Sequence, residues 1–138
     1  MGKTKQFLLV DDSEATNFFN RVMIQKTGYA DEILIAKNGQ EALDYLKSGV
    51  SPSIIFLDIN MPVMNGWEFL SAYEGLNDIE KKSKIVLMIG AELINDDKKR
   101  AEAISEVIKF SPKHLTKELI TEVVEEHLCV SEEVNPLR

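Results

Sequence analysis

Three aspartates stand directly after two short apolar runs of this 138-residue chain. Asp11 and Asp12 follow the run at 7–10, and Asp58 follows the run at 54–57. Crowded carboxylates repel one another, and each raises the pKa of its neighbours. A hard divalent cation such as Mg²⁺ offsets that repulsion, and it prefers oxygen ligands of this kind. The residue types therefore predict a magnesium site, provided that the two runs end at the same place in the fold.

Each acidic feature has a simpler explanation when it is taken alone. Asp11 and Asp12 would suit the N-terminus of a helix, where the helix dipole favours negative charge. Asp58 would be an ordinary acidic residue of a loop. Their joint placement after two buried strands favours a shared site instead. The sequence holds no Cys/His cluster, so it gives no support for a zinc site.

The elements that must position these residues alternate between apolar runs and amphipathic segments. Strands are expected at 7–10, 33–36, 54–57, 85–89 and 107–110. Helices are expected after Ser13 up to Gly28, from Asn38 to Gly49, over 66–76, over 96–104, and from Thr116 to Leu128. The third and fourth strands are apolar throughout, which indicates burial on both faces, as in a parallel sheet.

Five strands alternating with five helices predict an α/β fold, a doubly wound parallel sheet flanked by helices. Such folds bind ligands outside the carboxyl ends of their strands. If the first and third strands are central neighbours, Asp11, Asp12 and Asp58 converge at one edge of the sheet.

Composition excludes several classes of protein. Apolar residues make up 44% and charged residues 28% of the chain, as in a single soluble domain. No apolar run approaches the ~20 residues that cross a bilayer, and the N-terminus lacks a signal core, so we expect a cytoplasmic protein that binds no membrane. A net charge of −7 disfavours nucleic-acid binding. The single cysteine, Cys129, fits a reducing compartment.

Two segments resemble the receiver domain of two-component response regulators: FLLVDDS at 7–13 and IIFLDINMPVMNGWEFL at 54–70. The second is the more specific, because an apolar strand, Asp58, Met-Pro and Asn-Gly follow one another at fixed spacing. The resemblance covers about 5–128 and implies the flavodoxin-like receiver fold with strand order 2-1-3-4-5. Residues 129–138 are then a C-terminal tail, with no output domain after it.

The resemblance also implies a role for each residue. Asp58 corresponds to the aspartate that accepts a phosphoryl group from a histidine kinase or phosphotransfer protein. Asp11 and Asp12 correspond to the acidic pair of the Mg²⁺ site, with Asp12 the more direct ligand. Asn60 corresponds to the residue whose backbone carbonyl completes that site. Lys113 corresponds to the lysine that pairs with the phosphoryl oxygens.

Two switch positions of the family fall on Gly90 and Phe110. Gly90 stands where the fourth strand usually ends in Thr or Ser, whose hydroxyl donates to the phosphoryl group. Loss of a donor to a charged acceptor costs about 1.5–3 kcal/mol. Phe110 matches the aromatic that follows this hydroxyl inward, so its usual trigger is missing.

His114 replaces the proline that follows the lysine in the family. The proline bond is often cis, and a non-proline cis bond costs about 2.5–4 kcal/mol, which favours a trans bond here. A second alignment places Ser111-Pro112 at the Lys-Pro position and leaves no lysine there. We prefer Lys113, which keeps Phe110 in step without a gap, and expect His114 to be a surface loop residue.

The sequence thus favours a stand-alone receiver, not an enzyme, that is phosphorylated on Asp58 with Mg²⁺ and signals by binding a downstream protein. Pairing with a second copy of the chain is a further expected interaction. The alternative is a pseudo-receiver, an interaction module that is poorly phosphorylated or not at all. Gly90 and His114 favour this alternative, and the intact acidic residues with Lys113 oppose it. A hydrolytic enzyme is remote, because no additional base or substrate pocket can be named.

Overall fold

The computed structural model of the protein describes residues 5–77, 82–89 and 95–127. Within them, five strands and five helices alternate along the chain: β1 (Gln6–Val10), α1 (Glu14–Thr27), β2 (Glu32–Ala36), α2 (Gly39–Lys47), β3 (Ile54–Asp58), α3 (Gly66–Glu74), β4 (Lys84–Met88), α4 (Asn95–Glu102), β5 (Val107–Ser111) and α5 (Lys117–His127). Gly90, Cys129 and the tail 129–138 lie outside the described residues.

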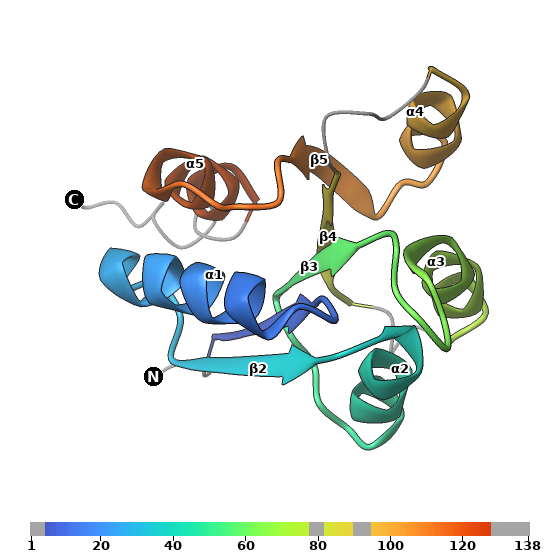
Figure 1. Ribbon diagram of the computed structural model, residues 1–138, viewed down its shortest axis with the longest axis horizontal. Helices are drawn as coiled ribbons and strands as arrows, with labels where there is room; N and C mark the ends of the chain where they lie inside the picture. Colours follow the sequence, from blue (N-terminus) through green and yellow to red (C-terminus); the bar gives the residue numbers. More distant parts are fainter. Residues whose placement is uncertain (1–4, 78–81, 90–94, 128–138) are drawn as a thin grey trace.

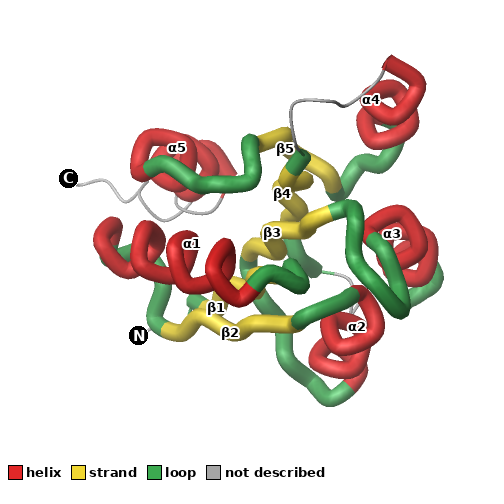
Figure 2. Tube along the Cα trace, in the orientation of Figure 1, coloured by secondary structure: helices red, strands yellow, loops and turns green. Residues whose placement is uncertain are grey.

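The strands form one parallel sheet in the order β2-β1-β3-β4-β5, which confirms the predicted fold class and strand order. Helices α1 and α5 cover one face of the sheet, and α2, α3 and α4 lie on the other (Figure 1). Figure 2 shows the strands as a yellow layer between these two groups of red helices. Among the described residues, no helix is long and apolar enough to cross a membrane.

The central strands are buried between two hydrophobic clusters. Every residue of β3 is buried, as the unbroken apolar run predicted. Ile54 and Phe56 pack toward α1 and α5, whereas Ile55 and Leu57 pack toward α2 and α3. A fully buried side chain of this size contributes about 1.5–3 kcal/mol, so the two clusters hold β3 firmly in place.

Strands β1 and β3 are hydrogen-bonded neighbours, with Val10 paired to Leu57 at their carboxyl ends. The residues that follow β1 and the last residue of β3 therefore emerge side by side at one edge of the sheet. The adjoining helix starts are fixed by side-chain caps. Ser13 accepts a hydrogen bond from the backbone of Thr16 to begin α1, and Asn65 forms a capping box with Glu68 to begin α3.

The loop from β3 to α3 is folded tightly against the strand end. Val63 has a φ of 68°, and the N–H of Met64 donates to the carbonyl of Pro62 across 2.7 Å, which forms a rare γ-turn. The N–H of Gly66 donates to the carbonyl of Ile59 at 2.8 Å. A Cβ on Gly66 would lie 2.5 Å from the carbonyl oxygen of the last residue of β3, so only glycine allows α3 to begin this close to the strand.

The described side chains of helix α4 bury little surface. Of its residues 98–102, only Ala101 is buried. The Arg100 guanidinium lies 4.3 Å from the centre of the half-buried Trp67 ring on α3. A cation–π contact thus supplements the single buried alanine in holding α4 to its neighbour.

Gly66→Ala is expected to lower the free energy of unfolding by about 1–3 kcal/mol, because the added methyl group meets backbone atoms that cannot rotate away. Gly75→Ala is the matched control at the other end of α3. Its Cβ would lie 3.5 Å from the nearest atom at a φ of −86°. That change should stabilise the protein by about 0.4–1 kcal/mol. Urea unfolding followed by circular dichroism measures both effects, and equal effects at the two positions would contradict this account.

Candidate functional site

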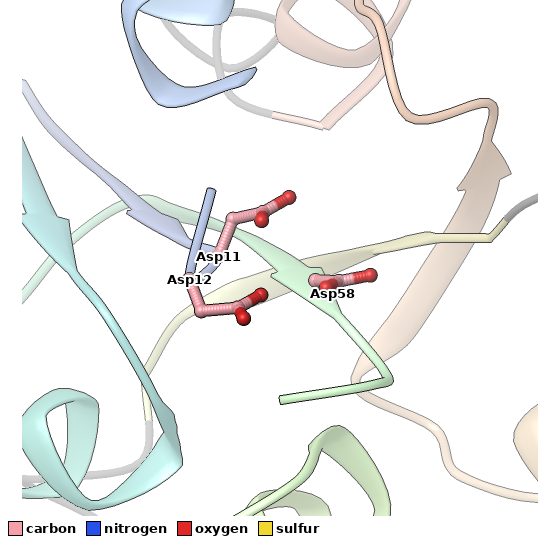
Figure 3. A group of neighbouring side chains, drawn as sticks. All are labelled: Asp11, Asp12 and Asp58. Atoms are coloured by element: carbon pink, nitrogen blue, oxygen red, sulfur yellow. The ribbon is translucent and has the colours of Figure 1, made fainter. Parts of the chain in front are cut away.

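The three aspartates singled out in the sequence lie together at the carboxyl ends of β1 and β3 (Figure 3). One carboxylate oxygen from each of Asp11, Asp12 and Asp58 lies within 4.8 Å of the others. Asp11 and Asp58 are only 6% and 1% exposed, whereas Asp12 is exposed. The site therefore combines two buried carboxylates with one that is open to solvent.

Asp11 is fixed in place through its backbone and its side chain. Its N–H donates to the carbonyl of Ala36 at the end of β2 across 3.0 Å. Its Oδ1 accepts from the N–H of Ser13 at 2.9 Å, and its carbonyl accepts from Nδ2 of Asn17 at 2.8 Å. Strand β2 and the first turns of α1 therefore set the position of this carboxylate.

Lys113 reaches the site from the loop between β5 and α5. Its Nζ lies 3.4 Å from Oδ1 of Asp58, and its side chain is 42% exposed. This ion pair agrees with the alignment that assigns Lys113 and not Ser111-Pro112 to the lysine position. Its role in phosphoryl transfer stays a prediction.

The neighbouring His114 is an exposed loop residue, as expected from the sequence. No peptide bond in the described residues is cis, so the Lys113–His114 bond is trans. The imidazole meets the ring of Phe19 on α1 edge-on, with 4.9 Å between ring centres. Helix α1 therefore contacts the lysine loop on its solvent side.

The electrostatics of the site disfavour two ionised buried carboxylates. Burial raises the pKa of Asp58 to about 6, the charge of Asp11 adds to the rise, and Lys113 only partly opposes it. Burial also raises the pKa of Asp11, against the hydrogen bond from Ser13 and the charge of Lys113. One ammonium group is too little positive charge for three clustered carboxylates.

A divalent cation with oxygen ligands fits this donor set. Oδ2 of Asp58 is buried and accepts no hydrogen bond from any residue that the structure describes, so it can still accept a ligand. All the clustered side chains offer carboxylate oxygens, the donors that Mg²⁺ prefers. Asn60 is exposed in the loop, two residues after Asp58, and the part played by its carbonyl stays a prediction.

Of the two predicted switch positions, Phe110 lies within the described residues. Phe110 is half-buried in β5, is paired with Leu87 of β4, and packs against the cluster on the α3 side of the sheet. Gly90 lies outside the described residues. The switch roles of both residues stay predictions.

Two buried asparagines of α1 contact the site and were missed in the sequence. Asn17 and Asn20 are 4% and 2% exposed, and both donate to backbone carbonyls near the acidic cluster or the lysine loop. With the buried Ile24 they recur at i, i+3 and i+7, the spacing of one helix face. The sequence signal that could have identified these two asparagines is a polar residue at a position on the core-facing side of the helix.

Comparison with known proteins places the chain among receiver domains. The family model described as "Response regulator receiver domain" matches residues 7–125. The chemotaxis protein CheY of Thermotoga maritima is 31% identical over 120 residues, which cover 83% of this chain and 94% of that protein. The crystal structure of a two-component response regulator from Cytophaga hutchinsonii superposes with a TM-score of 0.82 at 32% identity, covering 92% of this chain and 98% of that one.

Other relatives are longer than the matching part. The chain spans 7% of a hybrid signal transduction histidine kinase of Dictyostelium discoideum, at 25% identity, and 52% of two-component response regulator 24 of Arabidopsis thaliana, at 32% identity. It also matches 20% of a protein-glutamate methylesterase of Clostridium acetobutylicum, at 41% identity over 69 residues. The likeness to that enzyme is confined to a receiver portion.

Asp58→Asn is expected to stabilise the metal-free protein near neutral pH. The pKa of the carboxyl group is higher in the folded protein, about 6 against 3.8, so folding favours its protonated form. The corresponding stabilisation is fully present below about pH 3.8 and is lost as the pH rises through about 6. Allowing for partial screening by solvent, the substitution should add about 1–2 kcal/mol at about pH 7.5 and less at about pH 5.

The measurement is urea unfolding in the presence of a chelator at both pH values. Glu14→Gln removes the same charge from a nearby side chain that is 85% exposed, and it should change stability by less than about 1 kcal/mol. A larger gain for Asp58→Asn at the lower pH would reverse the predicted sign and contradict the electrostatic account.

Proposed function

This chain belongs to the family of response regulator receiver domains, and on that premise we propose that Asp58 accepts a phosphoryl group from a histidine kinase or a phosphotransfer protein. The observation that carries the proposal is the environment of Asp58 at the end of a buried strand. Its Oδ2 has no hydrogen-bond partner within the described part of the chain, its Oδ1 lies 3.4 Å from Nζ of Lys113, and two further carboxylates adjoin it.

Asp58 is the nucleophile in this proposal. One carboxylate oxygen forms a bond to phosphorus while the bond from phosphorus to the donor breaks, and the donor atom leaves with the electron pair. The donor atom is a histidine nitrogen in a phosphoprotein or the bridging oxygen of a small acyl phosphate. The product is an acyl phosphate on Asp58.

Lys113 acts both before and after the transfer of the phosphoryl group. Before transfer its ammonium group, 3.4 Å from Oδ1, opposes the rise in the pKa of Asp58 and so favours the ionised, nucleophilic form. After transfer the same ammonium group can pair with a phosphoryl oxygen. The long side chain of Lys113 is partly exposed, so it has room to move from the carboxylate to the newly attached phosphoryl group.

Asp11, Asp12 and Asp58 would hold Mg²⁺, with the backbone carbonyl of Asn60 as a further ligand. When bound, the ion supplies positive charge beside the phosphoryl oxygens. The carboxylate of Asp12 is exposed, so it can bind the ion in place of the water molecules that surround it. The buried Asp11 is instead held by hydrogen bonds of its backbone to β2 and α1. Asp12 is therefore assigned as the more direct ligand.

The output of this module is assigned to protein binding, through a downstream partner or a second copy of the chain. Residues 5–128 would act as one cytoplasmic receiver unit that is not itself an enzyme, and residues 129–138 would form a tail. The net charge of −7 argues against direct binding of nucleic acid or an anionic membrane surface. Gly90 and Phe110 are the proposed switch positions, with no hydroxyl at the first to couple to the second.

Incubation with acetyl phosphate and Mg²⁺ should add one phosphoryl group to the protein, detected as a gain in intact mass. The gain should be absent in Asp58→Ala and present in Glu14→Gln, which removes a nearby carboxylate outside the cluster. Absence of the adduct with acetyl phosphate and with histidine-phosphorylated donors would reject phosphoryl acceptance and support the pseudo-receiver alternative.

Mg²⁺ should raise the thermal unfolding temperature, because it binds the folded site and relieves the repulsion among its carboxylates. At a concentration ten times the dissociation constant, the expected stabilisation is about 1.4 kcal/mol. Asp12→Asn should reduce this shift and Glu14→Gln should preserve it. Thermal scans with Mg²⁺ and with a chelator provide the measurement, and an undiminished shift in Asp12→Asn would remove that residue from the proposed site.

A further inference from the structure

Asn20 is a polar side chain on the core-facing side of α1. It is only 2% exposed, and the next residue on this face, Ile24, is fully buried in the cluster between α1, α5 and the sheet. A buried amide that finds no partners is strongly destabilising. The partners of Asn20 therefore show what an apolar residue at this position would not provide.

Both ends of the amide bond the lysine loop. Nδ2 donates to the carbonyl of Lys113 at 3.0 Å, and Oδ1 accepts from the N–H of Leu115 at 2.8 Å. These backbone groups lie on either side of His114, beyond the end of β5 and before the start of α5. The single side chain thus bridges a loop segment that lies more than 90 residues away in the sequence.

The bridge fixes the base of the Lys113 side chain. The carbonyl held by Asn20 belongs to Lys113 itself, and the other anchored residue, Leu115, is 1% exposed. From this base the ammonium group lies 3.4 Å from Asp58. A lysine side chain has high rotational freedom, so its ammonium group stays near one carboxylate only if the backbone beneath it is held in place.

A second contact holds the loop from outside. Phe19, the residue before Asn20, meets the His114 ring edge-on at 4.9 Å, so α1 touches the loop on its buried and its exposed side. Phe19 is 41% exposed, and its contact is between two side-chain rings and includes no hydrogen bond to the backbone of the loop. The two hydrogen bonds to Asn20 are therefore the stronger constraint on the Lys113 backbone.

We propose that Asn20 is a positioning residue for phosphoryl transfer, one that sets the place of the Lys113 ammonium group beside Asp58 by bonding both sides of the loop. The inference rests on the proposed function, since it concerns the rate of the same transfer. Asn20 touches neither the phosphoryl donor nor Asp58 and acts through Lys113 alone.

The test is a double-mutant cycle on the rate of labelling by acetyl phosphate with Mg²⁺. In this reaction phosphorus bonds to an oxygen of Asp58, and acetate leaves with the electron pair of the broken bond. Asn20→Leu introduces an apolar side chain of similar size and removes both hydrogen bonds, and it should slow labelling about tenfold. Lys113→Met should slow labelling at least as much, and adding Asn20→Leu to Lys113→Met should slow it no further.

Ile24→Val is the matched control in α1. It removes one methyl group from the same buried face and leaves both hydrogen bonds of Asn20 to the loop in place, so it should lower stability and leave the labelling rate of the folded protein unchanged. Urea unfolding gives the folded fraction of every variant, and rates are compared per folded molecule. Asn20→Ser, whose hydroxyl cannot reach both loop atoms, replaces Asn20→Leu if the latter does not fold.

The outcomes separate the two claims. Wild-type protein that takes up no phosphoryl group overturns the proposed function, and this inference with it. Wild-type labelling with an unchanged rate in the Asn20 variants overturns the inference alone. Equal slowing by Asn20→Leu with and without Lys113 also overturns it, because the asparagine would then act independently of the lysine.

Discussion

Two buried carboxylates held close together at one edge of the sheet are the constraint on which the properties of the site depend. Asp58 is the last residue of a fully buried strand, and Asp11 directly follows the neighbouring strand. Neither can move away without breaking the ladder between β1 and β3 or exposing the apolar clusters beneath it. The repulsion is therefore retained by the fold, and this makes the site receptive to positive charge.

The acidic and basic parts of the site are supported in different ways. The buried carboxylates stand on central strands, whose position is set by the packing of both faces of the sheet. Lys113 stands on a loop, and its partial exposure gives its long side chain room to adjust. Helix α1 links the two parts, because Asn17 bonds the backbone of Asp11 and Asn20 bonds the backbone of the lysine loop. A single helix thus helps to set the position of the Lys113 loop relative to the acidic cluster.

The sequence was most informative where periodicity and position alone determine structure. Apolar runs located every strand to within one residue at each end, and the rule for strand ends brought Asp11, Asp12 and Asp58 together. Loops offered no such periodicity, so the lysine position depended on a choice between two alignments. Asn20 escaped notice because its partners lie across the fold and local pattern does not reveal them. The γ-turn at Val63 was equally hidden, since a β-branched residue rarely adopts a positive φ.

The contact between Arg100 and Trp67 gives α4 a separate local stability. A guanidinium over an exposed or half-exposed ring contributes about 0.5–1 kcal/mol, far less than the clusters that hold the central strands. Because Ala101 is the only buried side chain among its residues 98–102, we expect α4 to open at a lower free energy than the central strands. Because the chain contains a single tryptophan, its indole emission is an intrinsic optical reporter of whether this helix is seated.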